Sequence, residues 1–124
     1  PGTPYFELTI AAPGPWISTN SQRHRHHYQQ AAPVKLWRNA ARLAAVGTPA
    51  VEHPVTITAT VHKATRLAWD LDGITPTIKA CIDGLRDAGV LADDDCRHVV
   101  ALHIVAGCVC KPARLDLSIE RPAP

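Results

Sequence analysis

Aspartates gather at the two ends of one short segment of this chain, residues 69–95. Asp70 and Asp72 open the segment, and three consecutive aspartates, residues 93–95, close it. If the backbone is extended at the first pair, residues i and i+2 project to the same side, and their carboxylates repel each other unless a cation lies between them. Carboxylate oxygens suit Mg²⁺ or Mn²⁺, and an ion with open coordination positions can activate water next to a phosphoryl group. The spacing therefore indicates a catalytic site for a divalent metal.

A predicted helix joins the two acidic groups, and Lys79 lies one turn into it. About 15 helical residues span about 20 Å, so residues 93–95 must fold back along the helix to reach Asp70 and Asp72. We expect the Lys79 ammonium group to point toward the same space, where it would neutralise a phosphate or orient the scissile group. An ordinary ion pair with Asp83, four residues further on, is the alternative.

Charge is distributed unevenly along the chain, although the formal net charge is only +2. Seven of the eleven acidic residues lie within residues 70–95. The part before residue 70 carries these basic residues: Arg23, Arg25, Lys35, Arg38, Arg42, Lys63 and Arg66. A basic part beside an acidic cluster is typical of a metal-dependent enzyme that acts on a polyanion, and two ordinarily solvated surfaces are the alternative.

The hydrophobic pattern predicts one domain over residues 1–124 with four strands and two helices. Alternating apolar residues predict strands at residues 5–10, 55–63, 98–107 and 114–120. The first helix is expected to begin at Pro33, to end at Gly47 and to carry an outward basic stripe of Lys35, Arg38 and Arg42. The second helix is expected over residues 75–89, with Thr75 as its N-cap. Residues 18–30 have no period and predict a loop. The expected fold class is α+β, a mixed four-stranded sheet packed with two main helices.

Composition and cysteine spacing indicate the class of protein, its location in the cell and the state of its cysteines. The chain is 46% hydrophobic and 19% charged, which is typical of a globular protein. No apolar run approaches the roughly 20 residues that span a bilayer, and no signal-peptide pattern is present, so a soluble cytoplasmic protein is expected. The four cysteines form no CxxC pair and are expected to be buried or free thiols. A zinc site would use Cys96, His98, Cys108 and Cys110, whose spacing matches no standard zinc finger.

The acidic segment resembles the RusA family of Holliday-junction resolvases, found in bacteria and their phages. The family pattern is roughly D-x-D-N, then K-x-x-x-D-x-L, then A-G-V followed by D-D, and here it reads DLDG, KACIDGL and DAGVLADDD. FELTIAAPGPWISTN is similar to the family's opening strand and Pro-rich turn, and KLWRNAARLAA to its first helix. The likeness covers most of the chain, but only residues 70–95 are specific. Two departures are Gly73 in place of the Asn, and ITPT, which places Lys79 further from Asp72.

The resemblance implies a RusA-like fold and a Mg²⁺-dependent endodeoxyribonuclease, for which Mn²⁺ could substitute. Such an enzyme resolves four-way (Holliday) junctions in DNA recombination and repair, nicking two strands as a homodimer. By the same resemblance, Asp70, Asp72 and Asp94 would bind the metal, with Asp93 and Asp95 as rivals for the place of Asp94. Lys79 would be the catalytic lysine. The expected setting is the cytoplasm of a bacterial or phage-infected cell.

DNA contact follows from the charges, because basic side chains that neutralise phosphates give affinity without reading sequence. The candidates are Asn20, Arg23, Arg25, Lys35, Arg38 and Arg42. Two other functions stay open. One is a branched-DNA-binding module of the same fold without cleavage activity, which Gly73 favours. The other is a nuclease for flaps or other branched DNA on the same scaffold.

Overall fold

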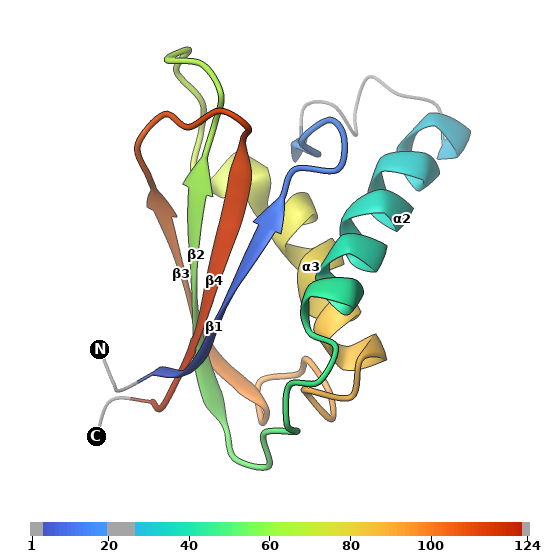
Figure 1. Cartoon of the computed structure of the whole chain (residues 1–124), viewed down its shortest axis with the longest axis vertical. Helices are drawn as coiled ribbons and strands as arrows, with labels where there is room; N and C mark the ends of the chain where they lie inside the picture. The colour runs from blue at the N-terminus through green and yellow to red at the C-terminus, as the bar shows by residue number, and fades with distance from the viewer. Residues whose placement is uncertain (1–3, 20–26, 123–124) are drawn as a thin grey trace.

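A mixed four-stranded sheet forms one layer of the molecule (Figure 1). The computed structural model describes residues 4–19 and 27–122. Its strands are β1 (Pro4–Ala11), β2 (Val55–His62), β3 (Val99–Ala106) and β4 (Arg114–Glu120). They lie in the order β1-β4-β2-β3, with β4 antiparallel to both neighbours and β2 parallel to β3. The predicted α+β class and mixed sheet are therefore confirmed.

Two helices cover one face of the sheet (Figure 1). They are α2 (His27–Ala44) and α3 (Thr75–Asp87), and a short 3₁₀ turn, η1 (Asp72–Ile74), runs directly into α3. Gly84 brings the two helices together, since a Cβ at this position would lie 2.3 Å from the Arg38 carbonyl oxygen. Trp37 of α2 and Leu85 of α3 are fully buried against the sheet core.

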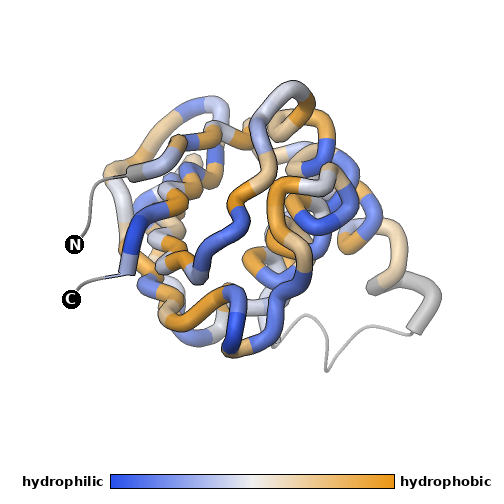
Figure 2. Tube along the Cα trace, turned by 90° about the horizontal axis from the view of Figure 1, so that it is seen from below, coloured by the Kyte–Doolittle hydropathy of each residue, from blue (hydrophilic) through white to orange (hydrophobic). Residues whose placement is uncertain are grey.

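Side chains alternate across the sheet, as the period of a strand requires. In β2 and β4 the apolar residues Val55, Ile57, Ala59, Leu115 and Leu117 face the helices and are buried. The residues between them are polar and face away from the helices. This alternation of hydrophobic and hydrophilic positions is visible along the chain in Figure 2. Within the described ranges, no helix is long and apolar enough to cross a membrane.

The helix boundaries differ from the predicted ones. α2 begins at His27, so residues 27–30 are helical rather than part of a loop, and Pro33 lies inside the helix. Proline lacks an N–H and therefore favours the first turn of a helix, which is why the sequence predicts a start at Pro33. Leu36 and Leu43 of this helix are 45% and 55% exposed.

The second helix matches its prediction more closely. α3 begins at Thr75 and ends at Asp87, and Gly89 follows with a φ of 81°, the left-handed conformation that a helix-terminating glycine adopts. Thr75 is not the N-cap, however. Ile74 holds that position, and the Thr75 hydroxyl donates a hydrogen bond to the Asp72 carbonyl oxygen (2.5 Å).

Candidate active site

Asp70 and Asp72 lie in the connection between β2 and α3, where the chain enters η1. The Gly73 amide donates to the Asp70 carbonyl oxygen (3.1 Å), and this turn carries both acids to the start of α3. The backbone is not extended there, because Leu71 has helical angles (φ −58°, ψ −46°). The two carboxylates share a site through this turn, so the reason given by the sequence was wrong although the pairing holds.

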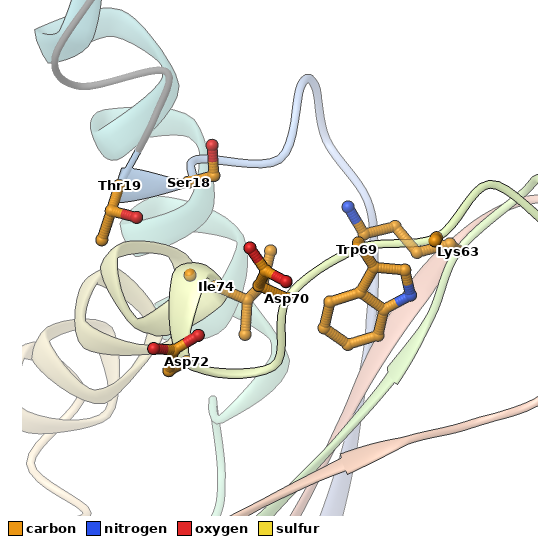
Figure 3. Close-up of a pocket in the computed structure, with 9 residues that line it drawn as sticks. Ser18, Thr19, Lys63, Trp69, Asp70, Asp72 and Ile74 are labelled. Carbon is orange, nitrogen blue, oxygen red and sulfur yellow. The ribbon is translucent and has the colours of Figure 1, made fainter.

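Both carboxylates line a polar pocket of about 550 Å³ (Figure 3). Its wall also includes Ser18 and Thr19, from the segment after β1, and Lys63 and Trp69, from the connection after β2. Gly73 lies in this wall too, and a Cβ there would meet the Asp70 Cβ at 3.5 Å and the Thr19 Oγ1 at 3.6 Å, which are ordinary contacts. The Cβ of a side chain at position 73, where the RusA pattern has Asn, would therefore fit without a clash.

Lys63 is held between two tryptophan rings beside the acids. Its Nζ lies 5.3 Å from the centre of the Trp16 ring and 5.2 Å from that of Trp69, both within cation–π range. Burial lowers the pKa of Lys63 below its usual value. Trp16 in turn packs on Trp37, with ring centres 4.7 Å apart. No specific role for Lys63 was predicted from the sequence, because its neighbours come from separate segments; the tryptophan next to Asp70 was the available signal.

One buried threonine fixes the segment that closes the pocket. The Thr77 hydroxyl, in the first turn of α3, accepts a hydrogen bond from the Ile17 amide and donates one to the Ile17 carbonyl oxygen, both at 2.8 Å. Thr77 and Ile17 are both buried. A single side chain thereby satisfies both backbone groups of Ile17 and places the two residues that follow, Ser18 and Thr19, at the pocket.

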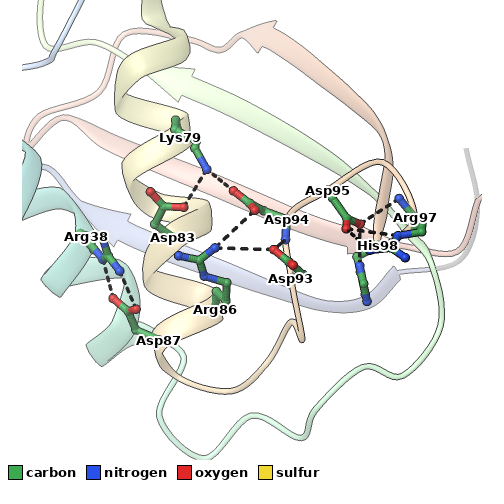
Figure 4. Close-up of polar contacts among 10 residues, drawn as sticks. All are labelled: Arg38, Lys79, Asp83, Arg86, Asp87, Asp93, Asp94, Asp95, Arg97 and His98. Carbon is green, nitrogen blue, oxygen red and sulfur yellow. Dashed lines mark hydrogen bonds and ion pairs between the residues drawn. The ribbon is translucent and has the colours of Figure 1, made fainter.

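The second acidic group folds back along α3, as expected, and meets Lys79 (Figure 4). The Lys79 ammonium group donates to Asp83 Oδ1 (2.8 Å) and forms a second ion pair with Asp94 Oδ2. These two hydrogen bonds raise the pKa of Lys79, and the bond from Lys79 lowers the pKa of Asp94 to about 2. Arg86 Nη1 lies 3.5 Å from carboxylate oxygens of both Asp93 and Asp94. The ion pair with Asp83, the alternative for Lys79, is therefore present together with a contact to Asp94.

Asp95 is held by its own loop. Its carboxylate accepts hydrogen bonds from the Arg97 guanidinium (2.8 Å) and lies 2.7 Å from His98 Nδ1. Hydrogen bonds from Arg97 and then His98 hold the pKa of Asp95 well below its usual range. These contacts keep Asp95 apart from Lys79 and from the pocket.

The donor set fits a divalent metal in part. Asp70 and Asp72 offer hard oxygen atoms at one pocket, and among the described residues neither carboxylate forms an ion pair. Neither Asp93 nor Asp94 belongs to the wall of that pocket. Within residues 4–19 and 27–122, no three His, Cys, Asp or Glu side chains lie close enough to hold a metal ion together. The structure thus brings Asp70 and Asp72 together and Asp94 to Lys79, and metal binding by any of these residues stays a prediction.

The predicted DNA contacts have different surroundings. Lys35 is exposed on α2. Arg38 instead donates two hydrogen bonds to the Asp87 carboxylate, at 2.6 and 2.8 Å, and Arg42 donates to the side chain of Asn39. Asn20, Arg23 and Arg25 lie outside the described residues.

The fold and this geometry define a class: an α+β domain with a paired-aspartate pocket at the start of its second helix. No family model matches the chain, and no curated protein matches it.

Proposed function

We propose that this protein is a Mg²⁺-dependent endodeoxyribonuclease that resolves four-way DNA junctions, the activity implied by its resemblance to the RusA family. The observation that carries the proposal is the shared pocket of Asp70 and Asp72, with the Lys63 cation in its wall. The two carboxylates would hold the ion. When bound, Mg²⁺ or Mn²⁺ supplies an activated water and neutralises charge on the phosphoryl oxygens.

The remaining charged groups have roles that this chemistry needs. Lys63 presents a positive charge to a phosphate that enters the pocket, where a preformed cation stabilises charge that develops in the transition state. Lys79 lies seven residues after Asp72, so about 10 Å separates the two along the helix axis. We assign Lys79 to a neighbouring phosphate and Asp94, once Lys79 releases it, to the metal.

Paired strand cleavage requires two pockets at one junction. A homodimer in the cytoplasm of a bacterial or phage-infected cell, bound to branched DNA, is the assembly that this proposal implies. Basic side chains on α2, among them the exposed Lys35 and Arg42, would contact phosphates without reading sequence.

Replacement of Asp70 by Asn tests the role of the pocket. The wild-type protein should nick a synthetic four-way junction in Mg²⁺, whereas Asp70→Asn should bind the junction at least as tightly, since a negative charge near phosphate is gone, and should not cleave it. Glu52→Gln, which removes an exposed carboxylate elsewhere, is the matched control and should cleave normally. Cleavage that survives Asp70→Asn would refute the metal role of this residue.

A branched-DNA-binding module without cleavage is the second candidate. The observation in its favour is that Asp94 is paired with Lys79 and lies outside the pocket. Incubation of the wild-type protein with a four-way junction and Mg²⁺ separates the two candidates, because a binding module gives a shifted band and no nicks. A fork and a linear duplex in parallel identify a nuclease for other branched DNA.

A further inference from the structure

A second polar cluster lies on the face of the sheet that the helices leave open. His62 and Arg114 are directly opposed residues of the antiparallel strands β2 and β4. Both contact the same oxygen, Asp116 Oδ2, at 3.2 Å from His62 Nε2 and 3.2 Å from Arg114 Nε. The other oxygen, Asp116 Oδ1, is buried and has no hydrogen-bond partner among the described residues. The nuclease proposal uses none of these groups.

The connection between β3 and β4 covers this pair. The Gly107 amide donates to the Val61 carbonyl oxygen and the Cys110 amide to that of Lys63, each at 2.9 Å. The three steps from Gly107 to Cys110 therefore run beside only two steps of the neighbouring chain, from Val61 in β2 to Lys63 just after it, so residues 107–110 are contracted. Gly107 permits the close approach, since a Cβ at this position would lie 2.5 Å from the His62 ring.

The contracted segment places two thiols over the opposed pair. Cys108 Sγ lies 3.7 Å from His62 Nδ1, and Cys110 Sγ accepts a hydrogen bond from Arg114 Nη1 at 3.1 Å. Opposed residues of antiparallel strands have Cβ atoms about 4.5–5.5 Å apart. The two sulfurs therefore contact the side chains of neighbouring residues, His62 and Arg114. Both cysteines are free thiols.

The spacing is compatible with a bond between the two sulfurs. Residues i and i+2 of a fully extended chain have Cα atoms about 7 Å apart, and disulfides form when this separation is about 4.4–6.8 Å. Because residues 107–110 are contracted, we expect the Cα atoms of Cys108 and Cys110 to lie closer together than this extended value. His62 Nδ1 also lies 2.9 Å from the Cys108 carbonyl oxygen, so the imidazole ring is fixed beside this residue.

We propose that Cys108 and Cys110 form a reactive dithiol site for low-molecular-weight disulfides. The exposed Cys108 thiolate attacks one sulfur of a small disulfide such as oxidised glutathione, forming a mixed disulfide and releasing one thiolate. The half-buried Cys110 thiolate then attacks the Cys108 sulfur, closing the intrachain disulfide and releasing the second thiolate. The two thiol protons end on the two released thiols. The protein loses two electrons, and the small disulfide is reduced.

The other two cysteines, Cys96 and Cys81, are controls for the effect of solvent accessibility on thiol reactivity. Cys96 is exposed, and in the described part of the chain no histidine or arginine side chain contacts its sulfur. Cys81 is buried, and burial raises the pKa of its thiol to about 12. A reagent that reports only exposure would thus treat Cys96 and Cys108 alike.

The test is incubation of the full chain with excess oxidised glutathione, followed over time by mass spectrometry of its peptides. We expect a Cys108–Cys110 disulfide, marked by the loss of two hydrogens and reversed by dithiothreitol, to form about tenfold faster than the glutathione adduct of Cys96. Cys110→Ser should stop at a stable glutathione adduct on Cys108, and Cys108→Ser should leave Cys110 reacting no faster than Cys96.

Two results would overturn the proposal. One is equal reactivity of Cys96 and Cys108 in the wild-type protein. The other is a glutathione adduct on Cys108 that persists although Cys110 is present. Asp116→Asn tests the cluster beneath the thiols, and it should slow the reaction of Cys108 while leaving that of Cys96 unchanged. Because the serine variants alter only a sulfur atom on the surface connection, they separate reactivity from folding.

Discussion

Single side chains decide what the pocket can bind. Lys63 lies beside Asp70 and Asp72 in the pocket wall although, among the described residues, it forms no ion pair with either. The faces of Trp16 and Trp69 attract the ammonium group electrostatically while leaving its N–H donors available to a ligand. This arrangement suits an anionic ligand such as a phosphodiester, which carries a bound counter-cation.

Lys63→Met should therefore lower kcat/KM for junction cleavage by roughly 100-fold, the order of effect seen when one preorganised donor to a developing oxyanion is removed. Stability should fall by only about 1 kcal/mol, because cation–π contacts at partly exposed sites contribute little. Junction cleavage and urea unfolding measure the two effects. Lys111→Met, at an exposed lysine that does not line the pocket, is the control, and wild-type cleavage by Lys63→Met would exclude the lysine from the reaction.

At the scale of elements, α2 and α3 are joined by packing at Gly84 and by the ion pair between Arg38 and Asp87. The hydrogen bonds from Arg38 lower the pKa of Asp87 below its usual value. Because the folded-state pKa is the lower one, the pair stabilises the fold at pH values above the unfolded pKa, near 4, and this contribution is lost as the pH falls through the folded-state value.

Asp87→Asn should accordingly destabilise the protein at pH 7 by less than about 1 kcal/mol, since both side chains are partly exposed. The difference between variant and wild type should shrink when unfolding is measured below the usual aspartate pKa. Urea midpoints at several pH values give the comparison, with Glu52→Gln as a control that shows no such trend. A difference that stays constant with pH would mean that the carboxylate charge is not what joins the helices.

The strands were predictable because alternation of apolar residues is a local property, and β4 matches its predicted bounds. The start of α2 was not predictable in this way, because proline favours the first turn of a helix. Pro33 instead lies in the interior of α2. Asp70 and Asp72 line one pocket as predicted, but through a helical turn and not through the extended backbone that their spacing suggested. The place of Asp94 was not predictable from spacing, because it depends on how far residues 93–95 fold back along α3, which is set by ion pairs with Lys79 and Arg86.

On the scale of the whole molecule, the pocket draws on two stretches that are distant in sequence, residues 18–19 and 63–74. The segment after β1 brings Ser18, together with Trp16, which contacts Lys63, and the connection from β2 to α3 brings Lys63 and Asp72. No hydrophobic periodicity indicates that these stretches meet, so the sequence predicted no role for Trp16 or Trp69 at the pocket. The same holds for the dithiol, whose cysteines meet His62 and Arg114 only through the register of β2 and β4.

The distribution of basic side chains over the molecule gives the last prediction, which concerns DNA binding. Lys35 is exposed, whereas Arg38 donates hydrogen bonds from two N–H groups to the Asp87 carboxylate. Lys35→Gln should weaken binding of a labelled four-way junction and reduce the slope of log K against log salt by about 1, the effect of one lost phosphate contact. Arg38→Gln should change this slope less and lower stability instead. Anisotropy titrations at several salt concentrations measure the slopes, with Lys111→Gln as the control. Equal loss of slope in both variants would show that Arg38 leaves Asp87 to bind phosphate, so that the contact between α2 and α3 opens on DNA.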